Sequence, residues 1–200
     1  MEGDESMDTK AKMKNRTGFD LFLRFAESCR RYLEKINRIS PEDNEIIKQY
    51  LYSNGKKPPE AVIKRVFYVA YPGLKKVQKR LNVKSMFEPA AVREFYAFDH
   101  NKMKFLQRDL VCIAYPAQVL AKSPKRENTY KFEFEPVSCR VWLKSDIELN
   151  IGEWVMIHRM IVVERATKNF AEKVISFLKD LGLNKEYKFP DKAIKYLINL

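Results

Sequence analysis

The sequence predicts an α+β protein in which an N-terminal helical bundle is followed by a small β-barrel with C-terminal helices. Three observations carry this prediction. Apolar residues recur at steps of three and four up to about residue 105, which is helical spacing. After that point apolar and polar residues alternate, as in strands. From Thr167 onward the helical spacing returns.

The helical half is expected over residues 18–107, after a disordered tail at residues 1–17. Its first helix shows one apolar stripe, formed by Phe19, Phe22, Leu23, Ala26, Cys29, Leu33 and Ile36. A second helix starts at Ser40, which can cap free amides, with Pro41 at the first helical position and Asp43 placed to reach back as in a capping box. Pro72 should kink or split the next helix, because proline donates no amide hydrogen. A fourth helix follows over "EPAAVREFYAFDHNKMKFL".

The strand-rich part is expected over residues 108–166. Pro116 should limit the first strand to a sheet edge or a bend. In the next strand Tyr130, Phe132 and Phe134 should face one side and their polar neighbours the other. "GEWVMIHRMIVVERA" is expected to form one strand or two strands that meet at a bend. Several short strands in so few residues favour a closed barrel, because closure removes exposed edges.

C-terminal helices that pack on the barrel are expected over residues 167–200. Thr167 is the predicted N-cap and Gly182 the stop of the first of them. "FPDKAIKYLINL" predicts a short last helix.

Composition bounds the class of protein. The net charge of +12 comes from 38 basic and 26 acidic side chains, which are spread along the chain rather than gathered in a tail. No run of eighteen apolar residues occurs, so we expect no membrane insertion. The three cysteines are odd in number and widely spaced, which argues against a disulfide framework and favours a cytoplasmic protein.

Motifs for catalysis are missing from the sequence. It contains no P-loop, GxGxxG, HExxH or GxSxG pattern, and no CxxC pair for a structural zinc site. A Cys–His nucleophile pair stays formally open, without a third member or an oxyanion site. We therefore expect a chaperone or binding protein rather than an enzyme.

Two motifs of the second half occur in an order that is typical of a known family. "VCIAYPAQVL" holds Cys112 and Pro116, and "IGEWVMIHRMIVVERATKNFAEKVISFLKDL" holds Gly152 and His158. Over about residues 110–182 the chain resembles the hydrogenase-maturation chaperones of the HypC/HupF family. Their chains open with Met-Cys, a few apolar residues, a proline and a strand, and later show a strand that ends in histidine and is followed by a helix.

The resemblance implies both a fold and a function. The fold is an OB-like β-barrel with a C-terminal helix. The function is that of an accessory protein for maturation of [NiFe]-hydrogenase or a related metalloenzyme, with a HypD-like protein and the enzyme precursor as partners. Cys112 would present a thiolate to iron or a partner, with His158 and Pro116 beside it. We expect no tightly bound cofactor, only transient iron with its diatomic ligands, cyanide and carbon monoxide.

The chain departs from the family pattern at the site itself. About 110 residues precede Cys112, whereas the family cysteine lies at the N-terminus. Met160 stands where the family has a glycine, and Arg159 is bulkier than the usual neighbour. The thiolate role needs a lowered pKa, for which Arg108, Arg159 and His158 are candidate sources of positive charge. It also needs Cys112 and His158 to meet at an accessible rim.

The cysteines and histidines also have purely structural interpretations. Cys112 is equally a buried core residue, and His158 equally a partner of a backbone carbonyl. We expect Cys29 and Cys139 in the core. His100 is expected on a helix surface or at an interface; if the helical half folds against the barrel, a Cys112/His158/His100 cluster would be a metal or redox site.

Two further functions stay open. One is binding of single-stranded nucleic acid, with Tyr130, Phe132 and Trp142 near Lys131 and Arg140 as a stacking platform. The other is a pure protein-interaction module that no longer handles metal.

Overall fold

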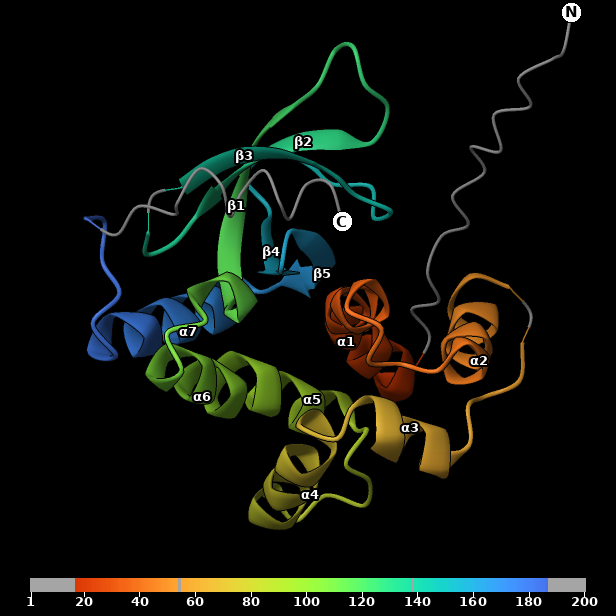
Figure 1. Ribbon diagram of the computed structural model, residues 1–200. Coiled ribbons are helices and arrows are strands. Elements are labelled where there is room, and N and C mark those ends of the chain that lie inside the picture. Colours follow the sequence, from red (N-terminus) through yellow and green to blue (C-terminus); the bar gives the residue numbers. More distant parts are fainter. Residues whose placement is uncertain (1–16, 54, 138, 187–200) are drawn as a thin grey trace, which may run out of the picture.

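The computed structural model describes residues 17–53, 55–137 and 139–186, and it has an α+β architecture (Figure 1). A helical region precedes a five-stranded antiparallel sheet, and one more described helix follows it. The helices are α1 (Gly18–Lys35), α2 (Pro41–Tyr52), α3 (Glu60–Val66), α4 (Ala70–Leu81), α5 (Pro89–Glu94), α6 (Asn101–Leu106) and α7 (Lys168–Asp180). The strands are β1 (Ala114–Lys122), β2 (Thr129–Phe134), β3 (Cys139–Lys144), β4 (Trp154–His158) and β5 (Ile161–Ala166).

The helix boundaries follow the local signals in the sequence. Thr17 and Asp20 form a capping box at the start of α1. Ser40 caps α2 as predicted, while the carboxylate of Asp43 accepts hydrogen bonds from Arg65. Pro72 divides the predicted third helix into α3 and α4, and it lies in the first turn of α4, where an amide has no partner within the helix.

The fourth predicted helix is continuous but not uniform. Between α5 and α6 the residues Phe95–His100 form a π-helical segment. Such a segment inserts one extra residue into the turn and is often found at functional sites. Asn101, directly after it, bonds the backbone of Ala97 and both backbone polar groups of Ala114. This anchors the end of the π segment to the start of β1.

The sheet has the hydrogen-bonded order β3-β2-β1-β4-β5. Along β2, the side chains of Tyr130, Phe132 and Phe134 are buried, which confirms the predicted alternation. The predicted closed barrel is not formed by the hydrogen bonds of the described strands, because β3 and β5 are the two edges of the sheet.

Pro116 is a correction to the prediction. It lies in β1, which pairs with both β2 and β4 and is therefore a central strand. The carbonyl of Pro116 accepts from Glu135, so its amide side faces the point where β2 has ended and the chain turns. The one ladder bond that Pro116 cannot donate would go to Glu135, just past the end of β2, so the loss falls at the end of the β1–β2 ladder.

The stretch "GEWVMIHRMIVVERA" forms two strands joined by a two-residue turn. Arg159 and Met160 both have positive φ, at 46° and 66°. Two such residues define the tight hairpin turn that matches strand twist, for which glycine and asparagine are usual. The turn fixes the end of β4, where His158 lies.

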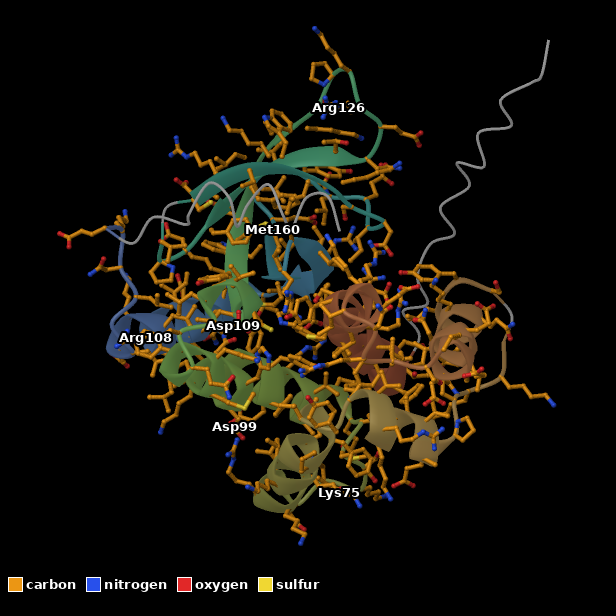
Figure 2. All side chains as sticks on the ribbon, viewed as in Figure 1. Lys75, Asp99, Arg108, Asp109, Arg126 and Met160 are labelled. Carbon is orange, nitrogen blue, oxygen red and sulfur yellow. The ribbon has the colours of Figure 1, made fainter. Side chains whose placement is uncertain are left out.

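Helices and sheet share one apolar core. α1 lies against β5, and α7 packs on β1 and β4 (Figure 1). The tip of the β1–β2 loop, at Arg126, projects away from the helices, whereas Lys75 on α4 lies at the opposite end of the molecule (Figure 2). Thr167 caps α7 and Gly182 follows its end, both as predicted.

Two predictions fall outside this description. The tail before Thr17 and the last predicted helix, at residues 189–200, lie outside the described residues. Among the helices that are described, none combines the length and the apolar character needed to cross a bilayer.

Candidate metal centre

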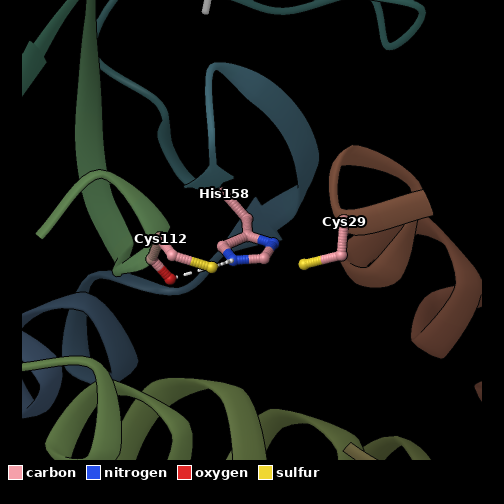
Figure 3. A group of neighbouring side chains, drawn as sticks. All are labelled: Cys29, Cys112 and His158. Atoms are coloured by element: carbon pink, nitrogen blue, oxygen red, sulfur yellow. Dashed lines mark hydrogen bonds between the residues drawn. The ribbon is translucent and has the colours of Figure 1, made fainter. Parts of the chain in front are cut away.

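Cys112 and His158 meet where the sheet faces the helical region (Figure 3). Cys112 ends a short 3₁₀ turn, Leu110–Cys112, just before β1. His158 ends β4 and is paired with Ala114 across the ladder. This register brings the Cys112 Sγ within 3.4 Å of the His158 Nε2. The two residues that the sequence singled out are therefore adjacent.

The ring of His158 is held by the helical region. Its Nδ1 lies 2.6 Å from the Phe25 carbonyl oxygen and 3.2 Å from the Ser28 hydroxyl. A carbonyl only accepts, so Nδ1 carries the proton and donates it to Phe25. Nε2 lies 3.0 Å from the Cys112 carbonyl oxygen and 3.4 Å from the Cys112 Sγ, so it donates to that carbonyl whenever it carries a proton. Nε2 offers a lone pair to a metal only when the proton is on Nδ1 alone. A carbonyl that fixes the other nitrogen in this way is the usual support of a metal-binding histidine.

His100 belongs to the same cluster. The side chain is buried, with 4% exposure, and its Nε2 lies 3.7 Å from the Cys112 Sγ. The expectation of a surface histidine is therefore wrong, and the interface alternative is confirmed. Burial lowers the pKa of His100, which favours a neutral ring that donates one hydrogen bond to Cys112. Its Nδ1 is buried and has no hydrogen-bond partner among the residues that the structure describes.

Cys29 is the member that sequence reasoning assigned to the core. It lies on α1, half-buried, and its Sγ, the Cys112 Sγ and a ring nitrogen of His158 all lie within 4.8 Å of one another. Nothing in its spacing from Cys112 or His158 signals this proximity. Only the packing of α1 against the sheet creates it.

The pKa values of the two thiols are shifted in opposite directions. The pKa of Cys112 is well below its usual value, because the Cys29 thiol donates a hydrogen bond to it and the two histidines add to the effect despite burial. The pKa of Cys29 is raised, because it faces Cys112 and is desolvated. The two shifts favour the thiolate form at Cys112 over the thiolate form at Cys29.

Arg159 supplies positive charge beside this pair. Its guanidinium stacks over the Tyr32 ring at 4.8 Å. Burial lowers its pKa, but the charges of Cys112 and Cys29 outweigh that effect and raise it, so the group stays charged. Its Nε is buried, and no residue in the described part of the chain forms a hydrogen bond with it. Arg108, the other predicted source of charge, is exposed on the far side of the connection to β1 (Figure 2).

The cluster is sealed rather than set at a rim. Cys112 is 1% exposed and His158 is fully buried. The stacked rings of Phe25 and Tyr96 lie beside it, with the Tyr96 centroid 5.6 Å from that of His158. The expected accessible rim is therefore wrong for this conformation, because the helical region covers both Cys112 and His158.

The remaining predicted site residues lie elsewhere. Pro116 is buried within β1, away from the cluster. Of the three rings of the predicted stacking platform, Tyr130 and Phe132 are fully buried and Trp142 is 44% exposed. Because bases stack on exposed rings, that platform is not assembled in this conformation.

No protein-family model, no curated protein and no solved structure matches this chain. The kinship with the HypC/HupF family therefore stays a prediction that rests on the two motifs.

Proposed function

We propose that this protein is a metal-handling accessory protein, related in function to the HypC/HupF chaperones, which carries iron as cargo between protein partners. Cys112 and His158 bind the iron. The observation that carries the proposal is the juxtaposition of a low-pKa sulfur and an oriented imidazole nitrogen at 3.4 Å.

The distances suit an ion held between these groups. With metal–sulfur bonds near 2.3 Å and metal–nitrogen bonds near 2.0 Å, two ligands of a tetrahedral ion are separated by about 3.5 Å. The Cys112–His158 separation of 3.4 Å agrees with that spacing. A thiolate and an imidazole suit Fe(II), Co(II) and Zn(II) better than they suit Mg²⁺ or Ca²⁺.

The sheet supports the kinship with an OB-like barrel. β1 pairs with both β2 and β4, so the chain order already places β3 and β5 at the two ends of the sheet. Residues of β3 and β5 also lie near each other. A small approach of these strands would close the five-stranded barrel that the resemblance implies.

Partner proteins follow from the buried position of the site. A buried thiolate can release its iron only when the helical region moves away from it. The free energy of binding a partner protein can drive that movement. By resemblance the partners are a HypD-like protein and a metalloenzyme precursor.

Iron binding by the full chain tests the proposal. The protein, Cys112→Ser, His158→Gln and the control Cys139→Ser are purified without oxygen, loaded with Fe(II), desalted and analysed for iron. Cys139 lies on β3 and is the matched thiol outside the cluster. We expect about one iron per chain in the protein and in the control, and a loss of at least tenfold in occupancy at fixed free iron in the other two. Equal iron content in all four would contradict the proposal and leave a protein-interaction module.

For protein purified from cells that assemble a nickel–iron enzyme, infrared spectra sharpen the test. Bands of iron-bound cyanide and carbon monoxide, absent from Cys112→Ser, would support carriage of the assembled group.

A further inference from the structure

We infer that Cys29 is a third ligand of the same ion, so that bound metal joins α1 to the sheet. The inference rests on the proposed function, because it needs an ion at Cys112 and His158. It goes further by assigning a ligand from the helical region and a role to that region.

The arrangement of the three side chains carries the inference. The sulfurs of Cys29 and Cys112 point toward each other, with the His158 ring beside them (Figure 3). One ligand atom from each lies within 4.8 Å of both others. Since the ligands of a tetrahedral ion are about 3.5 Å apart, a shift of about an ångström at one sulfur suffices to close on an ion.

Two buried polar atoms independently mark the centre as incomplete. The Nδ1 of His100 and the Nε of Arg159 lack partners among the described residues, and both side chains interact with Cys112. Buried polar groups are otherwise satisfied in nearly all proteins, so unpartnered atoms at one cluster indicate a missing group. An ion with a water or anion in its fourth position would supply a partner for the Arg159 guanidinium, whereas His100 turns its Nε2 rather than its Nδ1 toward Cys112.

The charge balance favours a divalent ion with two thiolates. Binding at Cys29 replaces its S–H proton, which leaves for solvent, and forms a sulfur–metal bond. Two thiolates then neutralise a divalent ion within a buried site, and Arg159 remains available to an anion in the open position. No oxidant or reductant is needed.

The elements that supply the ligands define the mechanical consequence. His158 belongs to β4 and Cys112 to the 3₁₀ turn that leads into β1, whereas Cys29 and the Phe25 carbonyl that orients His158 belong to α1. Loading with metal therefore fastens α1 to the sheet. Lifting α1 removes one ligand and the support of a second, which weakens the site and exposes the cargo to a partner.

Anaerobic titration with Co(II) tests this assignment in the full chain. Each thiolate bound to cobalt contributes charge-transfer absorption in the near ultraviolet. We expect Cys29→Ser to bind Co(II) with about half the charge-transfer intensity of the protein. Its affinity should fall by more than the 10–100-fold that loss of a supporting group costs. Cys139→Ser should behave as the protein does.

The outcomes separate the two proposals. If Cys29→Ser matches the protein in intensity and affinity while Cys112→Ser binds nothing, the Cys29 ligand is wrong and the proposed function stands. If the protein itself binds no Co(II) or Fe(II), the proposed function fails. Should Cys29→Ser not fold, X-ray absorption of the cobalt-loaded protein decides: two sulfur neighbours support the assignment and one sulfur overturns it.

Amide hydrogen exchange measures whether bound metal restrains α1 against the sheet. We expect Co(II) to slow amide exchange in α1 of the protein by at least tenfold and to leave α1 unchanged in Cys29→Ser. Equal slowing in both would contradict the coupling.

Discussion

Helix α1 reaches the sheet at two places that differ in kind. At Arg24 the guanidinium is 1% exposed and bonds both carboxylate oxygens of Asp146 at 2.7 Å, together with the Val163 carbonyl at 2.6 Å and the Val162 carbonyl at 3.1 Å. About one turn further on, Cys29 and the Phe25 carbonyl face Cys112 and His158. The first contact is a planar fork matched to a carboxylate, whereas the second is a loose gathering of sulfur and nitrogen atoms.

The difference lies in whether the protein satisfies its own buried groups. A buried charge is tolerated when its partners are in place, and Arg24 has them within the chain. The cluster at Cys29 keeps unpartnered nitrogens on His100 and Arg159. The comparison suggests that Arg24 holds α1 against the sheet permanently, while the cluster is completed only by a ligand.

The largest expected effect is therefore at the permanent contact. Replacing Arg24 with alanine removes the guanidinium that Asp146 and two strand carbonyls share. Removal of one partner from a buried pair costs about 3–5 kcal/mol of unfolding free energy. Denaturant unfolding of the metal-free protein measures the loss.

Arg140→Ala is the matched control, because Arg140 pairs with Glu133 on the exposed face of the sheet. An exposed pair contributes about 0–1 kcal/mol. A loss at Arg24 no larger than that of the control would show that this contact does not hold α1.

A smaller effect is expected from completing the cluster. Bound metal stabilises the folded protein by mass action, by about 2.7 kcal/mol at a free concentration of one hundred times Kd. For a chain of this size that corresponds to a rise in Tm of roughly 5–10 °C. Thermal unfolding with Co(II), and again after EDTA, measures the rise and its reversal.

The same scan separates the two contacts of α1. His158→Gln should show no rise with metal, whereas Arg24→Ala should unfold earlier yet keep a rise. If His158→Gln gains as much as the protein does, the stabilising metal binds elsewhere.

The sheet side of the cluster could be predicted from sequence, but the helical side could not. Cys112 and His158 lie within motifs whose order along the chain resembles a known family, and local periodicity sets the strands that carry them. Cys29 lies on an ordinary apolar stripe, and a cysteine there is by default a core residue. Its role depends on how α1 docks, which no local pattern encodes.

Pro116 and His100 illustrate the same limit. A proline lacks a donor and is expected at a sheet edge or a bend, yet Pro116 lies in a central strand, opposite the end of β2 where only one ladder bond is missing. His100 was placed on a helix surface by regular helical geometry. The π segment changes which residues share a face, and no residue type in "FYAFDH" announces it.

The smallest effect is expected at Arg159, where it is a shift in acidity rather than a loss of fold. Arg159→Leu removes a positive charge beside Cys112 and keeps an apolar contact for Tyr32. Because the charge favours the thiolate, its removal should raise the pKa of Cys112 toward the usual value. Thiolate absorbance near 240 nm, followed against pH in the metal-free protein, measures the midpoint.

The sign also fixes the pH dependence of stability. The folded-state pKa of Cys112 is lowered, so its thiolate contributes stability that is complete above the ordinary thiol pKa and is lost as pH falls through the folded-state value. Arg159→Leu should therefore begin to lose that contribution at a higher pH than the protein does. Arg165→Leu, which alters an exposed arginine on β5, should leave the midpoint unchanged. An unchanged midpoint in Arg159→Leu as well would mean that Arg159 serves the Tyr32 stack alone, and that the histidines and Cys29 set the acidity of the cluster.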